Sequence, residues 1–312
     1  MKRSTRSAIT IEIIGGLGNQ LFAYFAGLYI SNILRSPLRV FIRPLASGES
    51  SHSSTIKSFA FGSGVITRMS IPERVSLLVR KNLRMIFIRI GLTRKLTESL
   101  SRYHVSNTIG EDQELLESKP GYYLSGYFQT YEYFRYLKTN NLAPAFTLNS
   151  PSEWFNKESK RILEAKPIAV HIRRGDYLLD KNRFIGALSA KYYKNAIYAA
   201  RHHLGDLGEK EQSPPIWIFT DSQELVEKEM SPFFEGTFKI VSPPKNADPA
   251  ESMVLMSLAR SVVISNSTFS WWAAVLGSAQ VIVAPSKWFQ GHEDPKGLIP
   301  ENWIKIRSEW IS

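Results

Sequence analysis

One stretch of the sequence decides the predicted fold: Ile168-Ala169-Val170-His171-Ile172-Arg173-Arg174-Gly175-Asp176-Tyr177. Its apolar, β-branched first half is typical of a buried strand. Two arginines, a glycine and an aspartate follow; unpaired charges are costly to bury, whereas guanidinium forks suit phosphate oxygens. Because ligands bind at the carboxyl ends of strands in open α/β sheets, the stretch predicts a diphosphate site at a strand tip. The alternative is an exposed Gly-Asp turn closed by an Asp–Arg ion pair.

A glycine-rich turn follows another predicted strand near the N-terminus. Residues 8–14 have the composition of a strand, Gly15-Gly16-Leu17-Gly18-Asn19-Gln20 comes next, and the apolar run 21–30 is typical of a buried helix. This layout directs backbone N–H groups at an anion, although such a turn also allows close helix–strand packing alone. Leu21 stands where the dinucleotide fingerprint needs a third glycine, and no Gly-Lys-Ser/Thr follows. NAD-type and P-loop sites are therefore not expected.

Two more predicted strands end in polar residues. Asp221 and Ser222 follow residues 216–220, and Ser265-Asn266-Ser267-Thr268-Phe269-Ser270 follows residues 261–264. Asp221 suits either a helix cap or hydrogen bonds from a nucleobase or ribose. Ser and Thr are good helix caps, and the same hydroxyl groups suit a phosphate or a sugar hydroxyl. The residues alone leave both interpretations open.

Strand-like and helix-like segments alternate through the second half of the chain, which predicts a parallel sheet with crossover helices. A polar, proline-containing segment, 142–152, is a candidate linker between domains 1–150 and 151–312. The predicted strands are 167–172, 216–220, 238–241, 261–265 and 280–284, and the predicted helices are 191–203, 223–230, 249–259 and 269–276.

These motifs together resemble glycosyltransferase family 11, the α-1,2-fucosyltransferases, especially the bacterial members. The resemblance rests on Gly-Gly-Leu-Gly-Asn-Gln (15–20), His-Ile-Arg-Arg-Gly-Asp-Tyr (171–177), Phe-Thr-Asp-Ser (219–222) and Asn-Ser-Thr-Phe-Ser-Trp-Trp (266–272), which occur in the family's order. Ser222 stands where many members carry a second acidic residue. The resemblance implies a GT-B-like α/β fold, in which two Rossmann-like domains with parallel sheets face a cleft. Residues 1–150 would form the acceptor side, and 151–312 would bind the nucleotide sugar.

The implied reaction is inverting transfer of L-fucose from GDP-β-L-fucose to O2 of a galactose in a glycan such as a surface polysaccharide repeat unit. No cofactor or metal is implied, since no Asp-x-Asp motif occurs and arginines would stabilise the leaving GDP. The catalytic candidates are Arg173, Asp176 and Asn19. The donor-binding candidates are Gly16, Gly18, His171, Arg173, Arg174, Asp221, Ser222, Ser267, Thr268, Phe269 and Ser270.

Several alternatives stay open beside this reaction. Asp176 is either a general base or a carboxylate that orients an arginine, and Asp180, Glu12 or no strong base at all are the other options. Transfer of another sugar from a GDP or UDP donor is the alternative within the same class. A non-catalytic basic binding protein is the alternative from a different class, although it leaves the polar strand ends unexplained.

Composition narrows the class of protein further. The chain has no cysteine, which excludes disulfides and cysteine-based zinc or nucleophile chemistry and fits a reducing compartment. The longest apolar run, 21–30, is about half of the ~20 residues that span a membrane, and no signal peptide is visible. We expect a cytoplasmic protein, and peripheral contact with the inner face of the bacterial membrane is a further option.

The net charge of +11 is concentrated between residues 68 and 95, where cations alternate with bulky aliphatic residues and Glu73 is the single acid. Two interpretations have equal standing: a helical subdomain with a solvated basic face, and a helix attracted to an anionic membrane surface. In the second, Arg80, Lys81 and Arg84 would meet the lipid. No nucleic-acid motif is present, so no nucleic-acid partner is expected. The wider stretch 47–121 is where we expect acceptor specificity.

Overall fold

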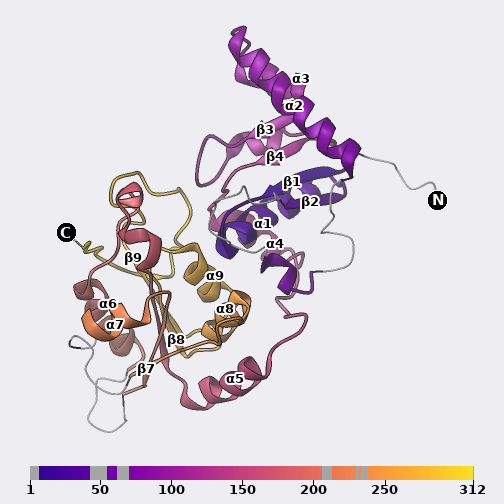
Figure 1. Cartoon of the computed structure of the whole chain (residues 1–312). Helices are drawn as coiled ribbons and strands as arrows, with labels where there is room; N and C mark the ends of the chain where they lie inside the picture. Colours follow the sequence, from indigo (N-terminus) through magenta and orange to yellow (C-terminus); the bar gives the residue numbers. More distant parts are fainter. Residues whose placement is uncertain are drawn as a thin grey trace. The chain divides into compact units, whose positions relative to one another are not determined.

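The computed structural model of this chain describes residues 7–42, 55–61, 70–205, 213–229, 232 and 238–311. The chain divides into two compact units, Met1–Thr147 with Pro295–Leu298, and Leu148–Asp294 with Ile299–Ser312 (Figure 1). Each unit is built on a parallel sheet flanked by helices, which confirms the predicted α/β fold class. Arg68, and the parts of the expected acceptor-specificity stretch at 47–54 and 62–69, lie outside the described residues.

The first unit has a four-stranded sheet in the order β2-β1-β4-β3, with every neighbouring pair parallel. Helix α1 covers one face and packs against α4, while α2 and α3 lie beside the other face. In chain order its elements are β1 (Ile9–Ile13), α1 (Leu17–Ile33), β2 (Leu38–Ile42), η1 (Thr55–Ser58), α2 (Ile71–Arg89), α3 (Arg94–Ser101), β3 (Tyr103–Val105), η2 (Gln113–Glu117), β4 (Tyr123–Ser125) and α4 (Tyr131–Thr139).

Helix α1 begins four residues earlier than the sequence predicts. The helix was expected to start at Leu21 because the apolar run begins there. Leu17 and Gly18 are also buried, however, and belong to the first helical turn. Only Gly15 and Gly16 form the turn, and Gly15 has a φ of +75°, a left-handed conformation that glycine adopts without steric cost. Close packing extends to Gly27, where a Cβ atom would lie 2.9 Å from Cγ2 of Ile11.

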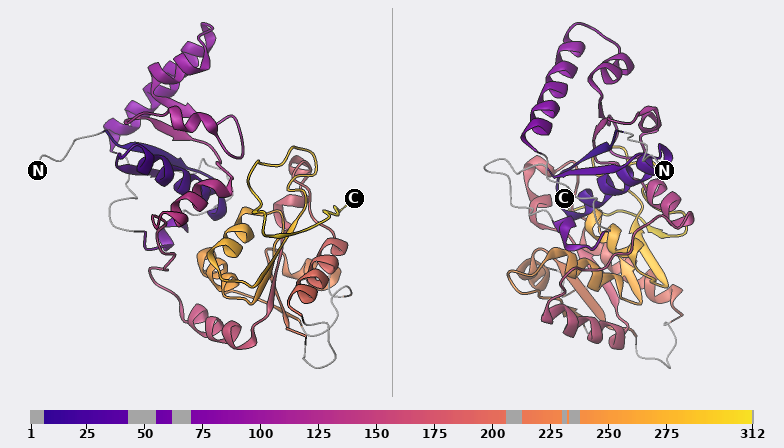
Figure 2. Two further views of the ribbon diagram at one scale, coloured as in Figure 1. Left: turned by 180° about the vertical axis from the view of Figure 1, so that it is seen from behind. Right: turned by 90° about the vertical axis from the view of Figure 1, so that its right-hand side faces the viewer.

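The second unit has a six-stranded, fully parallel sheet. Helix α6 covers one face with a core of Tyr192, Tyr193 and Ala196 against β5, β6, β8 and β9, and α8 and α9 lie on the other face (Figure 2). In chain order its elements are α5 (Glu153–Ala165), β5 (Ile168–Ile172), η3 (Gly175–Leu178), η4 (Asp180–Asn182), α6 (Ala190–His203), β6 (Ile216–Thr220), α7 (Gln223–Glu229), β7 (Phe238–Ile240), α8 (Pro249–Ser257), β8 (Ser261–Val263), α9 (Thr268–Leu276), β9 (Val281–Pro285) and β10 (Ile304–Ile306).

The strands of the second sheet lie in the order β10-β9-β8-β5-β6-β7. The order in which the chain adds strands reverses between β5 and β8, although all strands are parallel. From β5 the chain builds outward through β6 and β7, then returns to the other side of β5 and builds outward through β8, β9 and β10. This is the strand order of the nucleotide-binding Rossmann fold, in which ligands bind at the carboxyl ends of the two strands flanking the reversal. The fold therefore predicts that a ligand binds at the residues that follow β5 and β8.

Candidate active site

Three of the polar segments predicted from sequence meet at the carboxyl edge of the second sheet. Strand β5 pairs with β6 on one side and with β8 on the other, so the segments that follow these strands are neighbours. His171 Nδ1 lies 2.7 Å from Ser265 Oγ and links β5 to the segment after β8. Asp221, after β6, accepts a hydrogen bond at 2.9 Å from the backbone N–H of Arg174.

Arg173 lies between two carboxylates at this edge. Its Nη2 atom is 2.6 Å from Oδ1 of Asp176, and its Nη1 atom is 3.0 Å from Oδ2 of Asp221. The guanidinium also lies over the Tyr177 ring, 5.4 Å from its centroid. A guanidinium carries five N–H donors, so two ion pairs leave N–H groups able to meet further oxygens. The side chain retains 25% of its exposure, and its position is fixed while part of its surface stays open to solvent.

Arg174 has a different position from its neighbour. It is 1% exposed, its Nη1 donates to the Arg173 carbonyl at 3.0 Å, and its guanidinium lies 5.9 Å from the Tyr193 ring centroid on α6. The sequence predicts both arginines as donor-binding residues and only Arg173 as a catalytic candidate. The structure places Arg174 in the core beneath the loop and leaves Arg173 as the partly exposed cation at the strand end.

Gly175 permits the close contact between the loop after β5 and the end of β6. Its φ is +23°, and a Cβ atom at this position would overlap the Asp221 carboxylate. The Gly175 N–H donates to Ser222 Oγ at 3.2 Å. Asp221 and Ser222 therefore hold this loop, Asp221 with its carboxylate and Ser222 with its hydroxyl group.

His171 is a buried, uncharged hydrogen-bonding residue. It is 5% exposed, and burial, followed by the positive charge of Arg173, lowers its pKa to about 3. Its ring lies 5.5 Å from that of Phe269, centroid to centroid. His171 is therefore neutral near pH 7, and its contacts join β5 to Ser265 and to the start of α9.

The segment after β8 is occupied largely by its own hydrogen bonds. Ser267 caps α9 by accepting from the Phe269 N–H at 3.4 Å, and the buried Ser270 hydroxyl donates to the Ser267 carbonyl at 3.1 Å. Thr268 is half-buried and its hydroxyl has no hydrogen-bond partner in the described part of the chain. Among the hydroxyl groups of this segment, Thr268 is therefore the candidate for contact with a ligand.

Two residues outside the predicted set complete this region. Asn266 Nδ2 donates to the carbonyls of Gly186 and Trp288 at 3.0 and 3.1 Å, which ties the segment after β8 to two other loops. The Tyr177 hydroxyl donates to the Asn266 carbonyl at 3.1 Å, and burial raises the pKa of Tyr177 to about 12. Both lie within the motifs quoted from the sequence, but nothing in the order of residues shows which motif positions face inward.

The predicted residues of the first unit lie at the carboxyl end of β1. Gly16 caps α1, with no heavy atom within 4 Å of the place a Cβ would occupy, and Gly18 is buried in the first turn. Asn19 Oδ1 accepts from Nε2 of Gln129 at 3.0 Å. Gln129 follows β4, the neighbour of β1. It was absent from the predicted set, although polarity just after a strand was the signal available.

Glu12 and Asp180, two of the alternative general bases, differ in burial. Glu12 is 3% exposed; its carboxylate pairs with Lys81 Nζ at 3.2 Å and accepts from the Ser125 hydroxyl at 2.7 Å. These contacts hold the sheet of the first unit against α2. Asp180 is exposed and begins the short helix η4.

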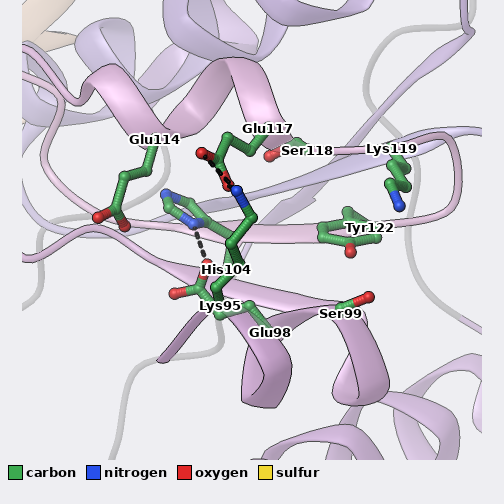
Figure 3. Close-up of a pocket in the computed structure, with 9 residues that line it drawn as sticks. All are labelled: Lys95, Glu98, Ser99, His104, Glu114, Glu117, Ser118, Lys119 and Tyr122. Atoms are coloured by element: carbon green, nitrogen blue, oxygen red, sulfur yellow. Dashed lines mark hydrogen bonds and ion pairs between the residues drawn. The ribbon is translucent and has the colours of Figure 1, made fainter. Parts of the chain in front are cut away.

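A cavity of about 170 Å³ opens in the first unit between α3, β3 and η2 (Figure 3). Four of its polar side chains form two pairs, Lys95 with Glu117 at 3.0 Å and His104 with Glu98 at 2.8 Å. Sugar and cofactor sites measure roughly 300–1,000 Å³. We therefore do not assign this cavity to the acceptor or the donor.

Two properties of the described residues bear on the class of site. They contain no group of three or more His, Asp or Glu side chains placed to hold a metal ion. Within the same part of the chain, none of the helices combines the length and the apolar character that crossing a membrane requires.

Comparison with solved structures gives distant likenesses. The NodZ α-1,6-fucosyltransferase crystal structure soaked with GDP-fucose is 14% identical, with 88% of this chain and 93% of that chain covered and a TM-score of 0.46. Escherichia coli ADP-heptose lps heptosyltransferase II is 10% identical, with 96% and 90% covered and a TM-score of 0.46. Such scores are too low for residue-by-residue comparison, so no role is transferred from either structure.

Curated sequences give closer relatives. The O-antigen biosynthesis glycosyltransferase WbnK of Escherichia coli is 26% identical over 314 residues, covering 94% of this chain and 98% of the relative. An alpha-1,2-colitosyltransferase of Escherichia coli is 25% identical over 313 residues, covering 96% and 99%. The model of glycosyl transferase family 11 matches residues 83–307, well over half of the chain. On this match, and with the motifs now placed at the ends of β1, β5, β6 and β8, the chain belongs to glycosyl transferase family 11.

Proposed function

We propose that this glycosyltransferase transfers L-fucose from GDP-β-L-fucose to O2 of a galactose residue, forming an α-1,2 linkage with inversion at the sugar. The acceptor galactose would belong to a glycan such as a surface polysaccharide repeat unit. The observation that carries the proposal is Arg173, a fixed and partly exposed cation at the strand-order reversal of a Rossmann sheet. Membership of family 11 supports it.

In the proposed reaction the galactose O2 attacks the anomeric carbon from the face opposite GDP. The bond between that carbon and the β-phosphate oxygen breaks, and its electron pair stays on the leaving diphosphate. Arg173 would stabilise this developing charge, since a positioned cation costs no reorganisation at the moment of reaction. The Thr268 hydroxyl and the N–H groups at the start of α9 would provide further donors to the diphosphate.

The O2 proton must leave as the new bond forms, and in this proposal it passes to solvent water, since the position of Asp176 does not favour a general base. Its Oδ1 atom is 2.6 Å from the Arg173 guanidinium, which favours a role in orienting that arginine over a role as general base. We therefore propose Asp176 as a positioning residue, together with Asp221. Asn19, an amide in the first unit, is our candidate for holding the acceptor.

A second donor is favoured by one of the relatives. The alpha-1,2-colitosyltransferase is as similar to this chain as the other curated relative, and colitose is L-fucose without its 3-hydroxyl group. A site with a hydrogen bond to the 3-hydroxyl discriminates strongly against a sugar that lacks it, because a buried partner is then left unpaired. Transfer of colitose is therefore the alternative function, with the same acceptor position and linkage.

The experiment is a transfer assay on a soluble β-galactoside with GDP-fucose and GDP-colitose as competing donors, and with UDP-galactose as a donor of another class. We expect fucosyl product with the sugar on O2, established by NMR of the purified product. A higher kcat/KM for GDP-colitose would reassign the donor while leaving the site intact. Transfer from UDP-galactose alone, or to another galactose hydroxyl, would overturn the proposal.

A further inference from the structure

Helix α2 exposes its apolar side and turns its polar side toward the protein. Side chains spaced three and four residues apart along one helical face, beginning with Ile71, Val75 and Leu78, point to solvent, and Leu77 is the one α2 residue that is fully buried. A surface helix of a globular protein normally buries its apolar stripe. The exposed fractions on α2 reach 77% at Ile71 and 60% at Leu78, and the other exposed apolar residues are Val75, Val79, Met85, Ile86 and Ile88.

The inward side of α2 is held by polar contacts. Arg80 Nη1 donates to the carbonyls of Arg102 and Gly121 at 3.2 and 2.8 Å, and Lys81 pairs with Glu12 at 3.2 Å. These bonds fix the rotation of the helix, so the outward direction of the apolar side is a property of the fold. Arg80 and Lys81, which would meet the lipid in the membrane interpretation of this stretch, are instead bonded to the protein.

The apolar surface continues onto the neighbouring helix. Leu96 and Leu100 of α3 are 45% and 53% exposed, and α3 packs beside α2. In Figure 1 and both views of Figure 2 the pair extends beyond the sheet of the first unit. We call the exposed residues of these two helices the α2–α3 face. Many exposed apolar side chains on two packed helices indicate a contact with another molecule or a membrane.

The charges of the α2–α3 face are positive where they are unpaired. Arg74 and Arg89 are exposed and form no ion pair with any residue that the structure describes. The two acidic residues of these helices are already engaged: Glu73 accepts from the Ser70 N–H and pairs with Arg39, and Glu98 pairs with His104 and Arg94. Apolar side chains flanked by unpaired arginines are complementary to an anionic lipid surface, where the arginines meet headgroups and the aliphatic groups enter the interface.

We propose that the α2–α3 face seats this protein on an anionic bilayer, with α2 lying in the plane of the interface. A helix of 19 residues that carries an acid and five basic residues does not cross the hydrocarbon core. The distribution of apolar and polar residues on α2 instead matches a helix that lies in the interface. The apolar side of such a helix enters the headgroup region, and the opposite side stays in contact with the protein. None of the residues of this surface is among the donor-binding candidates, and its test does not depend on the proposed reaction.

The absence of cysteine in the chain allows one probe to be attached at a chosen site. Leu78→Cys would carry an environment-sensitive NBD label on the α2–α3 face, and Leu163→Cys on α5, of similar exposure, is the matched control. With vesicles of phosphatidylcholine and phosphatidylglycerol we expect a blue shift and quenching by spin-labelled lipid at position 78 and no change at position 163. Pure phosphatidylcholine should give little response, and added salt should reverse the shift.

The arginines are tested by Arg74→Gln with Arg89→Gln. We expect at least a several-fold rise in the lipid concentration needed for half-maximal co-sedimentation, with unchanged transfer to a soluble acceptor, while Arg183→Gln leaves co-sedimentation unaltered. No response of the label at position 78 to anionic vesicles would overturn the proposal. So would a blue shift that depends on protein concentration without lipid, since a second copy of the chain would then cover the face.

Discussion

The Nη1 atom of Arg173 lies 3.0 Å from Oδ2 of Asp221 and joins the loop after β5 to the end of β6. Asp176 holds the other terminal nitrogen of the same guanidinium. Two carboxylates from different segments therefore fix one cation at the strand-order reversal. If this cation stabilises the leaving diphosphate, activity depends on its geometry as well as on its charge.

Replacing Arg173 with lysine should abolish most turnover without unfolding the protein. A lysine is a point charge that cannot bridge two carboxylates and also meet phosphate oxygens, and loss of one such stabilising group typically costs on the order of a hundredfold in kcat. Steady-state kinetics and thermal melting would measure both effects. Arg183→Lys, an exposed arginine a few residues along the same loop, is the control and should retain normal kinetics.

The two roles considered for Asp176 give different pH profiles. If Asp176 only orients Arg173, Asp176→Asn should lower kcat by roughly tenfold or less, the scale of one lost charge-assisted hydrogen bond, and leave the acid limb of the kcat profile in place. A general base contributes about 10²–10⁴-fold, and its removal would also abolish that limb. The second pattern would return Asp176 to the role of base.

Gly175→Ala should damage activity more than it damages stability. The added methyl group would overlap the Asp221 carboxylate and displace a group that positions Arg173. Gly205→Ala is the matched control, because Gly205 also has a positive φ but has nothing within 4 Å of its Cβ position. Both variants should lose about 1 kcal/mol through backbone strain, and only Gly175→Ala should lose turnover. Equal activity in the two would show that Asp221 adjusts without consequence.

His104 should make the first unit lose stability at alkaline pH. Burial alone would lower the pKa of His104, but hydrogen bonds and charges from Asp112 and Glu98, each 2.8 Å away, outweigh it and raise the pKa to about 9. Because the folded pKa lies above the unfolded value of 6.5, this contribution is complete below pH 6.5 and is lost as the pH rises through 9. Thermal melting of wild type and His104→Gln should converge over that range. A constant difference from pH 6 to pH 9 would show that His104 is neutral in the folded protein.

His171 should make the second unit lose stability at acid pH, whereas His104 affects stability at alkaline pH. Its folded pKa of about 3 lies below the unfolded value of 6.5, so the unfolded chain binds the additional proton between these values. The stability contributed by neutral His171 is complete above pH 6.5 and is lost as the pH falls toward 3. His171→Asn, which keeps a hydrogen-bonding group toward Ser265, should flatten the melting profile on this side. The same acid slope in the variant would contradict the assignment.

The sequence was sufficient to predict five of the six strands of the second sheet, because they are short apolar runs bounded by polar or turn residues, whereas β10 (Ile304–Ile306) was not predicted. The predicted strand over residues 216–220 matches β6 at both ends, and the strands around it agree within one or two residues. The start of α1 was misplaced because glycine and asparagine in a first helical turn carry no apolar periodicity.

The sequence alone did not predict which side chains point into the protein and which point to solvent. Arg173 and Arg174 are adjacent and chemically identical, yet one lies at the surface and the other in the core, because the backbone turns at the end of β5. The same holds for α2, where cations and aliphatic residues alternate closely enough that either side could face inward. Hydrogen bonds between Arg80 and two distant carbonyls decide the orientation, and no local pattern encodes them.

The most direct test of the account is transfer from GDP-fucose to a β-galactoside by wild type and Arg173→Lys, both in excess EDTA. If Arg173 stabilises the leaving GDP without a metal, wild type should form the O2-linked product at its full rate under these conditions, and the variant should fall by about a hundredfold or more. Loss of wild-type activity in EDTA with recovery in Mg²⁺ or Mn²⁺, or near-normal turnover of the variant, would contradict the account.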